Sequence, residues 1–134
     1  REDAQKFIAD AERQGIFLRI TNDGHFRDFD KQAELYAKGR TMPGEIVTNA
    51  KPGQSFHNYG LALDVVEIKN GKALWDNPRW PQIAKIAAKY GFKWGGSWGD
   101  KPHFQKTFGY KWSDLLMKYN SGNFSKDGYI KLVA

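Results

Sequence analysis

The strongest constraint on the fold is a carboxylate inside an apolar segment. Residues 61–68 read LALDVVEI, a pattern that predicts a buried β-strand, and Asp64 lies in its middle. Burying an ionised carboxylate is strongly unfavourable unless the charge is paired or bound to a metal ion. Whatever fold the chain adopts must therefore place an opposite charge or a metal ion beside Asp64.

One histidine lies near Asp64 in the sequence. His57 precedes Asp64 by seven residues, within the stretch SFHNYGLALD. On one straight strand, side chains seven residues apart point to opposite faces, so the chain must bend for the two to meet. Gly60 can adopt a positive φ and allows such a bend over residues 58–60. A salt-bridged or helix-capping Asp64, with His57 as an ordinary loop residue, is the alternative that these two residues leave open.

A second motif lies at residues 94–105, which read WGGSWGDKPHFQ. It places His103 at the start of a predicted strand, behind a glycine-rich turn. The chain has no cysteine, so a metal ion can be held only by His, Asp or Glu side chains. His57, Asp64 and His103 supply two imidazoles and one carboxylate. Three such ligands, with a fourth position left for water, are the pattern of a catalytic zinc site.

Asp100 is the candidate general base, because it stands three residues before His103. Zinc lowers the pKa of a bound water to about 7. A nearby carboxylate is still needed to take the proton of that water and pass it to a leaving amine. The alternative is that Asp100 only shapes the turn in GDKP.

Both motifs resemble those of the M15 zinc peptidases, the family of D-Ala-D-Ala carboxypeptidases and L-alanyl-D-glutamate endopeptidases. SFHNYGLALD fits the signature SxHxxGxAxD, and WGGSW…DKPHFQ is similar to the second signature of the endopeptidase branch, which includes phage endolysins and bacterial wall hydrolases. The likeness runs over about residues 16–119. It implies one zinc ion bound by His57, Asp64 and His103, with Asp100 as the catalytic acid and base.

The resemblance extends upstream to residues 24–40, GHFRDFDKQAELYAKGR, which are similar to a family segment that carries an arginine. It implies that Arg27 stabilises the oxyanion of the tetrahedral intermediate. This sequence is one residue longer than the usual pattern before that arginine, which puts His25 near it; we expect His25 to be a solvated loop residue. Three further side chains are expected to contact substrate: Ser55, Trp98 and Gln32.

The remaining pattern predicts an α+β fold with a small, mostly antiparallel sheet flanked by helices, because helical segments alternate with strands that are mostly linked as hairpins. The resemblance implies a hedgehog/DD-peptidase-like arrangement with the zinc site at the sheet face. Predicted helices cover residues 3–14, 28–39, 77–91 and 113–120, with Asp28 or Asp30 capping the second and Ser113 the last. Predicted strands cover residues 16–22, 61–68, 92–94 and 103–106, and an Asn-Gly turn leads to a further hairpin strand at 72–75.

Two regions fall outside this regular pattern. Residues 40–54 hold two Pro and two Gly and predict a long loop, of the kind that is often functional. We expect residues 1–120 to form one peptidase domain. Residues 121–134 are expected to be a polar tail of unknown role that includes one strand-like piece, YIKLV.

The composition indicates the kind of partner. The formal net charge is +6, which favours an anionic partner such as a cell-wall polymer. The basic residues are scattered and carry no recognised nucleic-acid motif, so nucleic acid is not an expected partner. No apolar run approaches the roughly 20 residues that span a bilayer. The first segment, REDAQKFIADAERQG, reads as an amphipathic helix rather than a secretory signal.

These observations favour a monomeric zinc peptidase that acts on peptidoglycan stem peptides at the bond between L-Ala and D-Glu. Its place of action would be the cell wall, whether periplasmic, extracellular or reached by phage delivery. A D,D- or L,D-carboxypeptidase is the alternative within the family, with residues 40–54 forming a pocket for a free carboxylate. A non-catalytic wall-binding module is the alternative of another class, although such a module would not require Asp100 and Arg27.

Overall fold

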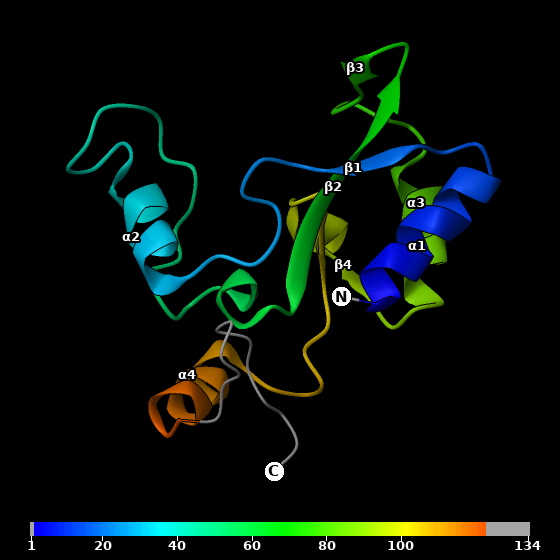
Figure 1. The fold of residues 1–134 in the computed structure, drawn as a ribbon. Helices are drawn as coiled ribbons and strands as arrows, with labels where there is room; N and C mark the ends of the chain where they lie inside the picture. Colours follow the sequence, from blue (N-terminus) through cyan, green and yellow to red (C-terminus); the bar gives the residue numbers. More distant parts are fainter. Residues whose placement is uncertain (1, 123–134) are drawn as a thin grey trace. The chain divides into compact units, whose positions relative to one another are not determined.

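A computed structural model describes residues 2–122 of the chain (Figure 1). The described residues divide into two compact units, a sheet unit and a helical unit. The sheet unit contains the described residues up to His25 together with Ala62–Lys106. The helical unit contains Phe26–Leu61 and the described residues from Thr107 onward.

The sheet unit is built on the long strand β2, Ala62–Lys69. The other strands are β1 Leu18–Ile20, β3 Lys72–Ala73, β4 Lys93–Trp94 and β5 His103–Gln105. The strands run in the order β1-β2-β5-β4, with β3 also paired to β2, and every pairing is antiparallel. The predicted α+β class and antiparallel sheet are confirmed.

Two helices pack with this sheet: α1, Glu2–Arg13, and α3, Trp80–Ala88. The Phe7 ring of α1 is fully buried, with its centroid 5.3 Å from that of Phe104 and 5.8 Å from that of Phe92. The apolar residues of β2 and the inner face of α3 complete one core. Its members are Phe7, Ala11, Ile16, Leu63, Val65, Val66, Trp80, Ile83, Ile86, Ala87, Phe92 and Phe104.

A second carboxylate of β2 is buried in the sheet unit, three residues after Asp64. Glu67 is only 1% exposed. It forms a salt bridge with Arg79, whose Nε lies 3.2 Å from Oε1, and it accepts a hydrogen bond of 2.9 Å from Asn77 Nδ2. This buried charge is paired, as the cost of burying a carboxylate requires.

The helical unit contains α2, Phe29–Ala37, a short 3-10 helix η1, Phe56–Tyr59, and α4, Trp112–Asn120. Asp28 caps α2 as predicted, because its Oδ1 accepts a hydrogen bond of 2.7 Å from the backbone N–H of Lys31. Three aromatic rings hold the unit together. Phe29 stacks on Tyr119 at 4.5 Å between centroids and meets Tyr59 edge-on at 6.2 Å.

The predicted loop at residues 40–54 contains no helix or strand. Arg40 fixes its shape, since Nη1 donates to the carbonyl oxygens of Tyr36 at 2.6 Å and Thr48 at 3.0 Å, and Nη2 donates to Asn49 Oδ1 at 3.1 Å. The guanidinium also lies 3.8 Å from the centroid of the Tyr36 ring. One arginine thus joins the end of α2 to the far side of the loop.

Two helix starts differ from the prediction. Helix α3 begins at Trp80 rather than at 77, because Asn77 Oδ1 accepts a hydrogen bond from the Arg79 N–H and holds residues 77–79 in a turn. Helix α4 begins at Trp112, with Lys111 rather than Ser113 at the N-cap. The predicted strand-like piece YIKLV lies outside the described residues.

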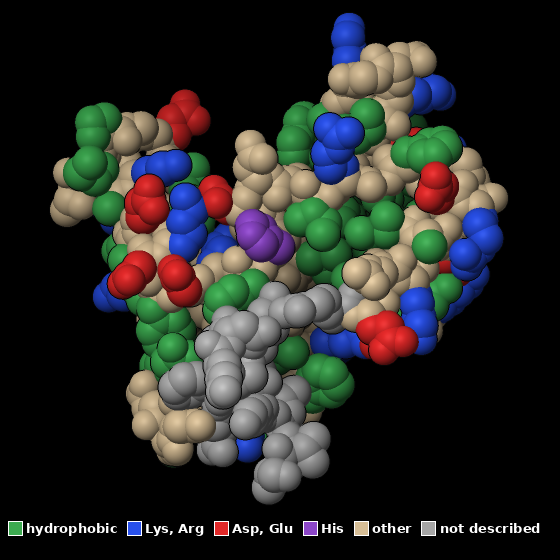
Figure 2. Space-filling model, viewed as in Figure 1, with side chains coloured by type: hydrophobic (Ala, Val, Ile, Leu, Met, Phe, Trp, Pro, Cys, Tyr) green, Lys and Arg blue, Asp and Glu red, His purple; other side chains and the backbone are tan. Residues whose placement is uncertain are grey.

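Charged side chains of both signs are exposed on the surface. On the face drawn in Figure 2, Lys and Arg side chains are interspersed with Asp and Glu, so that face carries no large area of one sign. None of the helices in residues 2–122 has the length and apolar character of a membrane span.

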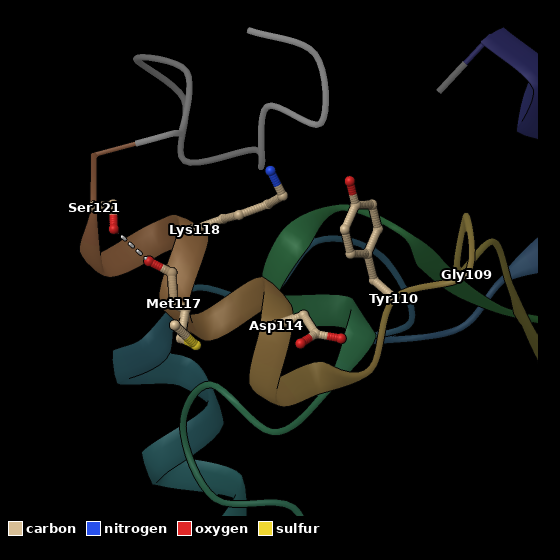
Figure 3. Close-up of a pocket in the computed structure, with 6 residues that line it drawn as sticks. All are labelled: Gly109, Tyr110, Asp114, Met117, Lys118 and Ser121. Atoms are coloured by element: carbon tan, nitrogen blue, oxygen red, sulfur yellow. Dashed lines mark hydrogen bonds between the residues drawn. The ribbon is translucent and has the colours of Figure 1, made fainter.

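A pocket beside α4 is lined by Gly109, Tyr110, Asp114, Met117, Lys118 and Ser121 (Figure 3). None of these six residues is a predicted site residue.

Asp10 of α1 connects this helix to the end of α3. Its carboxylate accepts hydrogen bonds from the Tyr90 hydroxyl at 2.7 Å and from Gln14 Nε2 at 3.0 Å, and Lys89 Nζ lies at 3.4 Å. The Tyr90 hydrogen bond, followed by that of Gln14 and the charge of Lys89, lowers the pKa of Asp10 from 3.8 to about 2.

A carboxylate whose pKa falls on folding stabilises the fold at pH values above its unfolded pKa, and that contribution is lost as the pH drops through the folded pKa. We therefore expect Asp10→Asn to lower the free energy of unfolding at pH 7 and to flatten its decline between pH about 4 and about 2. Urea denaturation across that pH range measures both effects. Glu12→Gln, exposed on the same helix, is the control for loss of a surface charge. An unchanged acid slope in Asp10→Asn would contradict the assignment.

Candidate metal site

The partner of Asp64 within the sheet unit is His103. The two residues are directly opposite in the β2–β5 register, which places their side chains close together on one face. His103 Nδ1 lies 3.1 Å from Asp64 Oδ1. The side chains are 10% and 18% exposed, so the pair is largely shielded from water while still reachable. The carboxylate in the apolar strand is therefore matched by an imidazole.

The second ring nitrogen of His103 is also engaged, since Nε2 lies 2.7 Å from Gln105 Oε1. Burial is the largest influence on this ring and lowers its pKa. The hydrogen bonds to Asp64 and Gln105, with the negative charges of Asp64 and Asp100, outweigh burial and raise the pKa of His103 above its ordinary value. A metal ion that binds this imidazole must displace its proton, so metal affinity will rise with pH.

Asp100 is carried by the glycine-rich segment before β5, which begins with the 3-10 helix η2, Gly95–Trp98. The Asp100 N–H donates to the Gly95 carbonyl at 2.8 Å, and the His103 N–H donates to the Asp100 carbonyl at 3.1 Å. One carboxylate oxygen of Asp100 lies 3.9 Å from His103 Nδ1, and the side chain is 52% exposed. Asp100 is thus beside the imidazole and open to solvent.

Two glycines allow this segment to fold so tightly. A Cβ on Gly95 would lie 2.5 Å from the Asp100 carbonyl oxygen and 2.9 Å from His103 Cβ. A Cβ on Gly96 would lie 2.2 Å from the indole of Trp94, whose Nε1 donates to the Lys101 carbonyl at 2.6 Å. The predicted glycine-rich turn is therefore a close backbone packing that only glycine permits.

Trp98, predicted to contact substrate, lies at the end of η2. Its side chain is 54% exposed, and its ring meets the His103 ring edge-on with 6.2 Å between centroids. An exposed aromatic ring beside the imidazole is a suitable surface for a bound molecule.

The helical unit holds His57, on η1. Ser55 is the N-cap of this helix, and its Oγ accepts a hydrogen bond of 3.2 Å from the His57 N–H. Gly60 ends the helix with φ 73° and ψ 20°, the left-handed conformation expected for the bend. His57 itself is only 2% exposed. Ser55, predicted to contact substrate, is thus engaged in shaping the turn that presents His57.

Arg27 lies beside this turn within the same unit. Its backbone N–H donates to the His57 carbonyl at 2.9 Å, and its Nη1 lies 3.5 Å from Gln32 Oε1. Gln32 is completely buried, so a substrate could reach it only after rearrangement of its neighbours. His25 is exposed, as expected.

Each unit therefore supplies part of the predicted ligand set. The sheet unit carries Asp64 and His103, and the helical unit carries His57. Two imidazoles and one carboxylate suit zinc by donor chemistry, because zinc takes nitrogen and oxygen ligands in catalytic sites.

Sequence reasoning missed two residues, Gln105 and Asn58. Gln105 had a usable signal, because it lies two residues after His103 on the same face of a strand. Asn58 belongs to the capping box of η1, in which it stands three residues after Ser55.

The chain is similar to known proteins over most of its length. Residues 1–112 match the family model described as VanY: D-alanyl-D-alanine carboxypeptidase. The peptidoglycan L-alanyl-D-glutamate endopeptidase CwlK of Bacillus subtilis is 40% identical, over 78% of this chain and 70% of that protein.

Two solved structures have a similar fold. The L,D-carboxypeptidase DacB from Streptococcus pneumonia has a TM-score of 0.59 and 20% identity, covering 97% of this chain and 75% of that one. The vancomycin-resistance D,D-pentapeptidase VanY from a VanB-type cassette, solved with Zn(II), has a TM-score of 0.58 and 16% identity, covering 78% and 68%. At these identities the likeness establishes the fold alone.

The packing around Gly95 predicts a loss of metal affinity on substitution. Gly95→Ala forces the added methyl group against the Asp100 carbonyl and His103 Cβ, so His103 must shift from its present position. We expect the zinc affinity of the metal-free protein to fall about 10–100-fold, the usual effect of disturbing the support of a metal ligand. Competition with a coloured chelator measures this affinity. Ser97→Ala, at an exposed position of the same 3-10 helix, is the matched control. Wild-type affinity in Gly95→Ala would refute this reasoning.

Proposed function

The chain belongs to the VanY D-alanyl-D-alanine carboxypeptidase family, and on this premise we propose that it is a zinc peptidase that cleaves peptidoglycan stem peptides between L-Ala and D-Glu. The observation that carries the choice of bond is the 40% identity to an L-alanyl-D-glutamate endopeptidase over most of both chains. The family model matches residues 1–112, which contain the sheet unit and the helical unit as far as the start of α4, and this supports one peptidase domain over residues 1–120.

His57, Asp64 and His103 are the proposed zinc ligands. Each of the three offers one ligand atom to a metal ion. A zinc ion held there would supply Lewis-acid activation of a water molecule and of the scissile carbonyl. The hydrogen bond that Gln105 Oε1 accepts from His103 Nε2 orients the His103 ring, as partners behind metal ligands commonly do.

Asp100 is the proposed acid and base. Its side chain is half exposed and lies beside His103, so it can exchange protons with a water molecule at the site. It takes the proton of the attacking water and then donates it to the departing amine of D-Glu. One carboxylate serves both steps, because it gives up in the second step the proton that it gained in the first.

Arg27 is the proposed oxyanion stabiliser. A guanidinium that is already oriented stabilises the negative charge that develops on the carbonyl oxygen during attack. The hydrogen bond between the Arg27 N–H and the His57 carbonyl ties this arginine to the turn of one proposed ligand. Trp98 would offer its exposed ring as an apolar surface for the stem peptide.

A D,D- or L,D-carboxypeptidase is the second candidate, favoured by the description of the family and by the fold shared with DacB. Such an enzyme needs a cation for the free carboxylate of its substrate. The arginine of the 40–54 loop, Arg40, already donates to three oxygens of its own unit, whereas Lys51 is an exposed cation of that loop and could serve. Either enzyme would act as a monomer at the cell wall, in the periplasm or outside the cell.

Peptidoglycan digestion distinguishes the two candidates. Mass spectrometry of the products is expected to find new N-terminal D-Glu, because the L-Ala–D-Glu bond is broken. Removing the metal with a chelator should abolish this cleavage, and added zinc should restore it. Release of a terminal D-Ala or other C-terminal residue would instead identify a carboxypeptidase. Cleavage that persists after verified metal removal would exclude a zinc peptidase.

Asp100→Asn separates catalysis from metal binding. Asparagine has nearly the same shape but cannot accept the proton, so kcat is expected to fall about 10²–10⁴-fold while one zinc remains bound. Digestion assays stopped at fixed times measure kcat, and metal analysis of the same preparation measures the bound zinc. Asp76→Asn, the same change at an exposed position of the sheet unit, should keep wild-type kcat. If Asp100→Asn loses its zinc yet turns over normally once reloaded, Asp100 is a ligand rather than the base.

A further inference from the structure

Two side-chain amides, Gln32 on α2 and Asn58 on η1, meet in the interior of the helical unit. They are 0% and 1% exposed, and Asn58 Nδ2 donates to Gln32 Oε1 at 3.3 Å. We propose that this amide pair is the positioning device for Arg27, fixing both its backbone and its guanidinium relative to the His57 turn. The proposal rests on the catalytic role of Arg27 given above, and it replaces substrate contact as the role of Gln32.

Gln32 joins three parts of the unit. Its Oε1 accepts from Asn58 Nδ2 and faces Arg27 Nη1 at 3.5 Å, and its Nε2 donates to the Ala50 carbonyl at 2.8 Å. Rotating the amide by 180° would set a donor against two donors and an oxygen against a carbonyl oxygen. Only one orientation satisfies all three partners, so the acceptor for Arg27 has a fixed direction.

Asn58 completes the arrangement with both ends of its amide. Its Oδ1 accepts from the backbone N–H groups of Gly53 at 3.0 Å and Ser55 at 3.2 Å. Its Nδ2 donates to the Arg27 carbonyl at 3.1 Å as well as to Gln32. A rotated Asn58 amide would set its nitrogen against two N–H donors and its oxygen against two oxygens. Asn58 therefore ties the end of the 40–54 loop, the start of η1 and the backbone of Arg27 to one side chain.

Arg27 is thereby held at three points. Its N–H donates to the His57 carbonyl, its C=O accepts from Asn58, and Nη1 is within reach of Gln32 Oε1. A long arginine side chain loses much rotational freedom when it is ordered, and holding it in advance removes that cost from the transition state. A buried network whose members are all satisfied is also rigid. These contacts fit a positioning role and leave no amide atom of Gln32 for substrate.

A double-mutant cycle tests the proposal. Gln32→Leu removes the acceptor, and it is expected to lower kcat on a soluble L-Ala–D-Glu stem peptide about 10–100-fold, with KM changed less than twofold. In the Arg27→Ala background the same change should alter kcat less than twofold, because its effect passes through Arg27. An equal fall in both backgrounds, or no fall in the wild-type background, overturns the proposal.

Further variants separate positioning from general damage. Gln32→Glu keeps an acceptor for Arg27 and Asn58 but loses the donor to Ala50, so it should recover most of the kcat that Gln32→Leu loses; failure to recover overturns the role of Oε1. It also serves if Gln32→Leu does not fold. Gln82→Leu, the same substitution at an exposed position of α3, should match wild type.

A measurement that needs no activity distinguishes failure of this proposal from failure of the proposed function. In NMR spectra of the whole chain, the Asn58 side-chain amide protons should exchange slowly with solvent, and Gln32→Leu should speed that exchange at least tenfold while His57 and the fold are retained. Rapid exchange in the wild-type protein overturns the amide pair even if peptidoglycan is cleaved. Slow exchange with no cleavage of any stem peptide leaves the pair standing and removes the enzymatic role.

Discussion

The pairing of Asp64 with His103 is the interaction on which the sheet unit is organised. It requires β2 and β5 to be antiparallel neighbours in one particular register, because a shift by one residue would turn one of the two side chains to the opposite face. The same register places Phe104 opposite Leu63, and both lie in the core. Packing and polar pairing therefore favour the same alignment. The carboxylate is accommodated at the edge of the core, where its exposure of 18% leaves access for a small ion.

Some features could be predicted from the sequence because a local pattern admitted few alternatives. Asp64 interrupts an apolar strand, and Gly60 was needed to bend the chain after His57; the structure gives Gly60 the positive φ that this bend requires. Asp28 as the cap of α2 followed from its position before a helical pattern. In each case the residue type and its immediate neighbours in the sequence were compatible with only a few conformations or partners.

Other features could not be predicted, because they depend on which segments meet in space. Asn77 starts α3 late by holding a turn, and it does so while bound to Glu67, ten residues away. The tight packing of Gly96 on Trp94 looked in sequence like any glycine-rich turn. Asn58 binds Arg27 and Gln32, which are more than twenty residues away in the sequence, so the pairing of the two buried amides carried no local signal. Spatial pairing of polar side chains is the information that a single sequence lacks.

The two carboxylates of β2 face basic side chains of different kinds. Glu67 faces Arg79, and a guanidinium keeps its proton at any pH that a folded protein meets. Asp64 faces an imidazole, which can lose its proton near neutrality. They stand three residues apart and so point to opposite faces of the strand. One carboxylate is thus permanently committed to the architecture, whereas the other faces a partner whose charge is reversible. The two acids of β2 therefore differ in whether the charge that faces each of them is permanent.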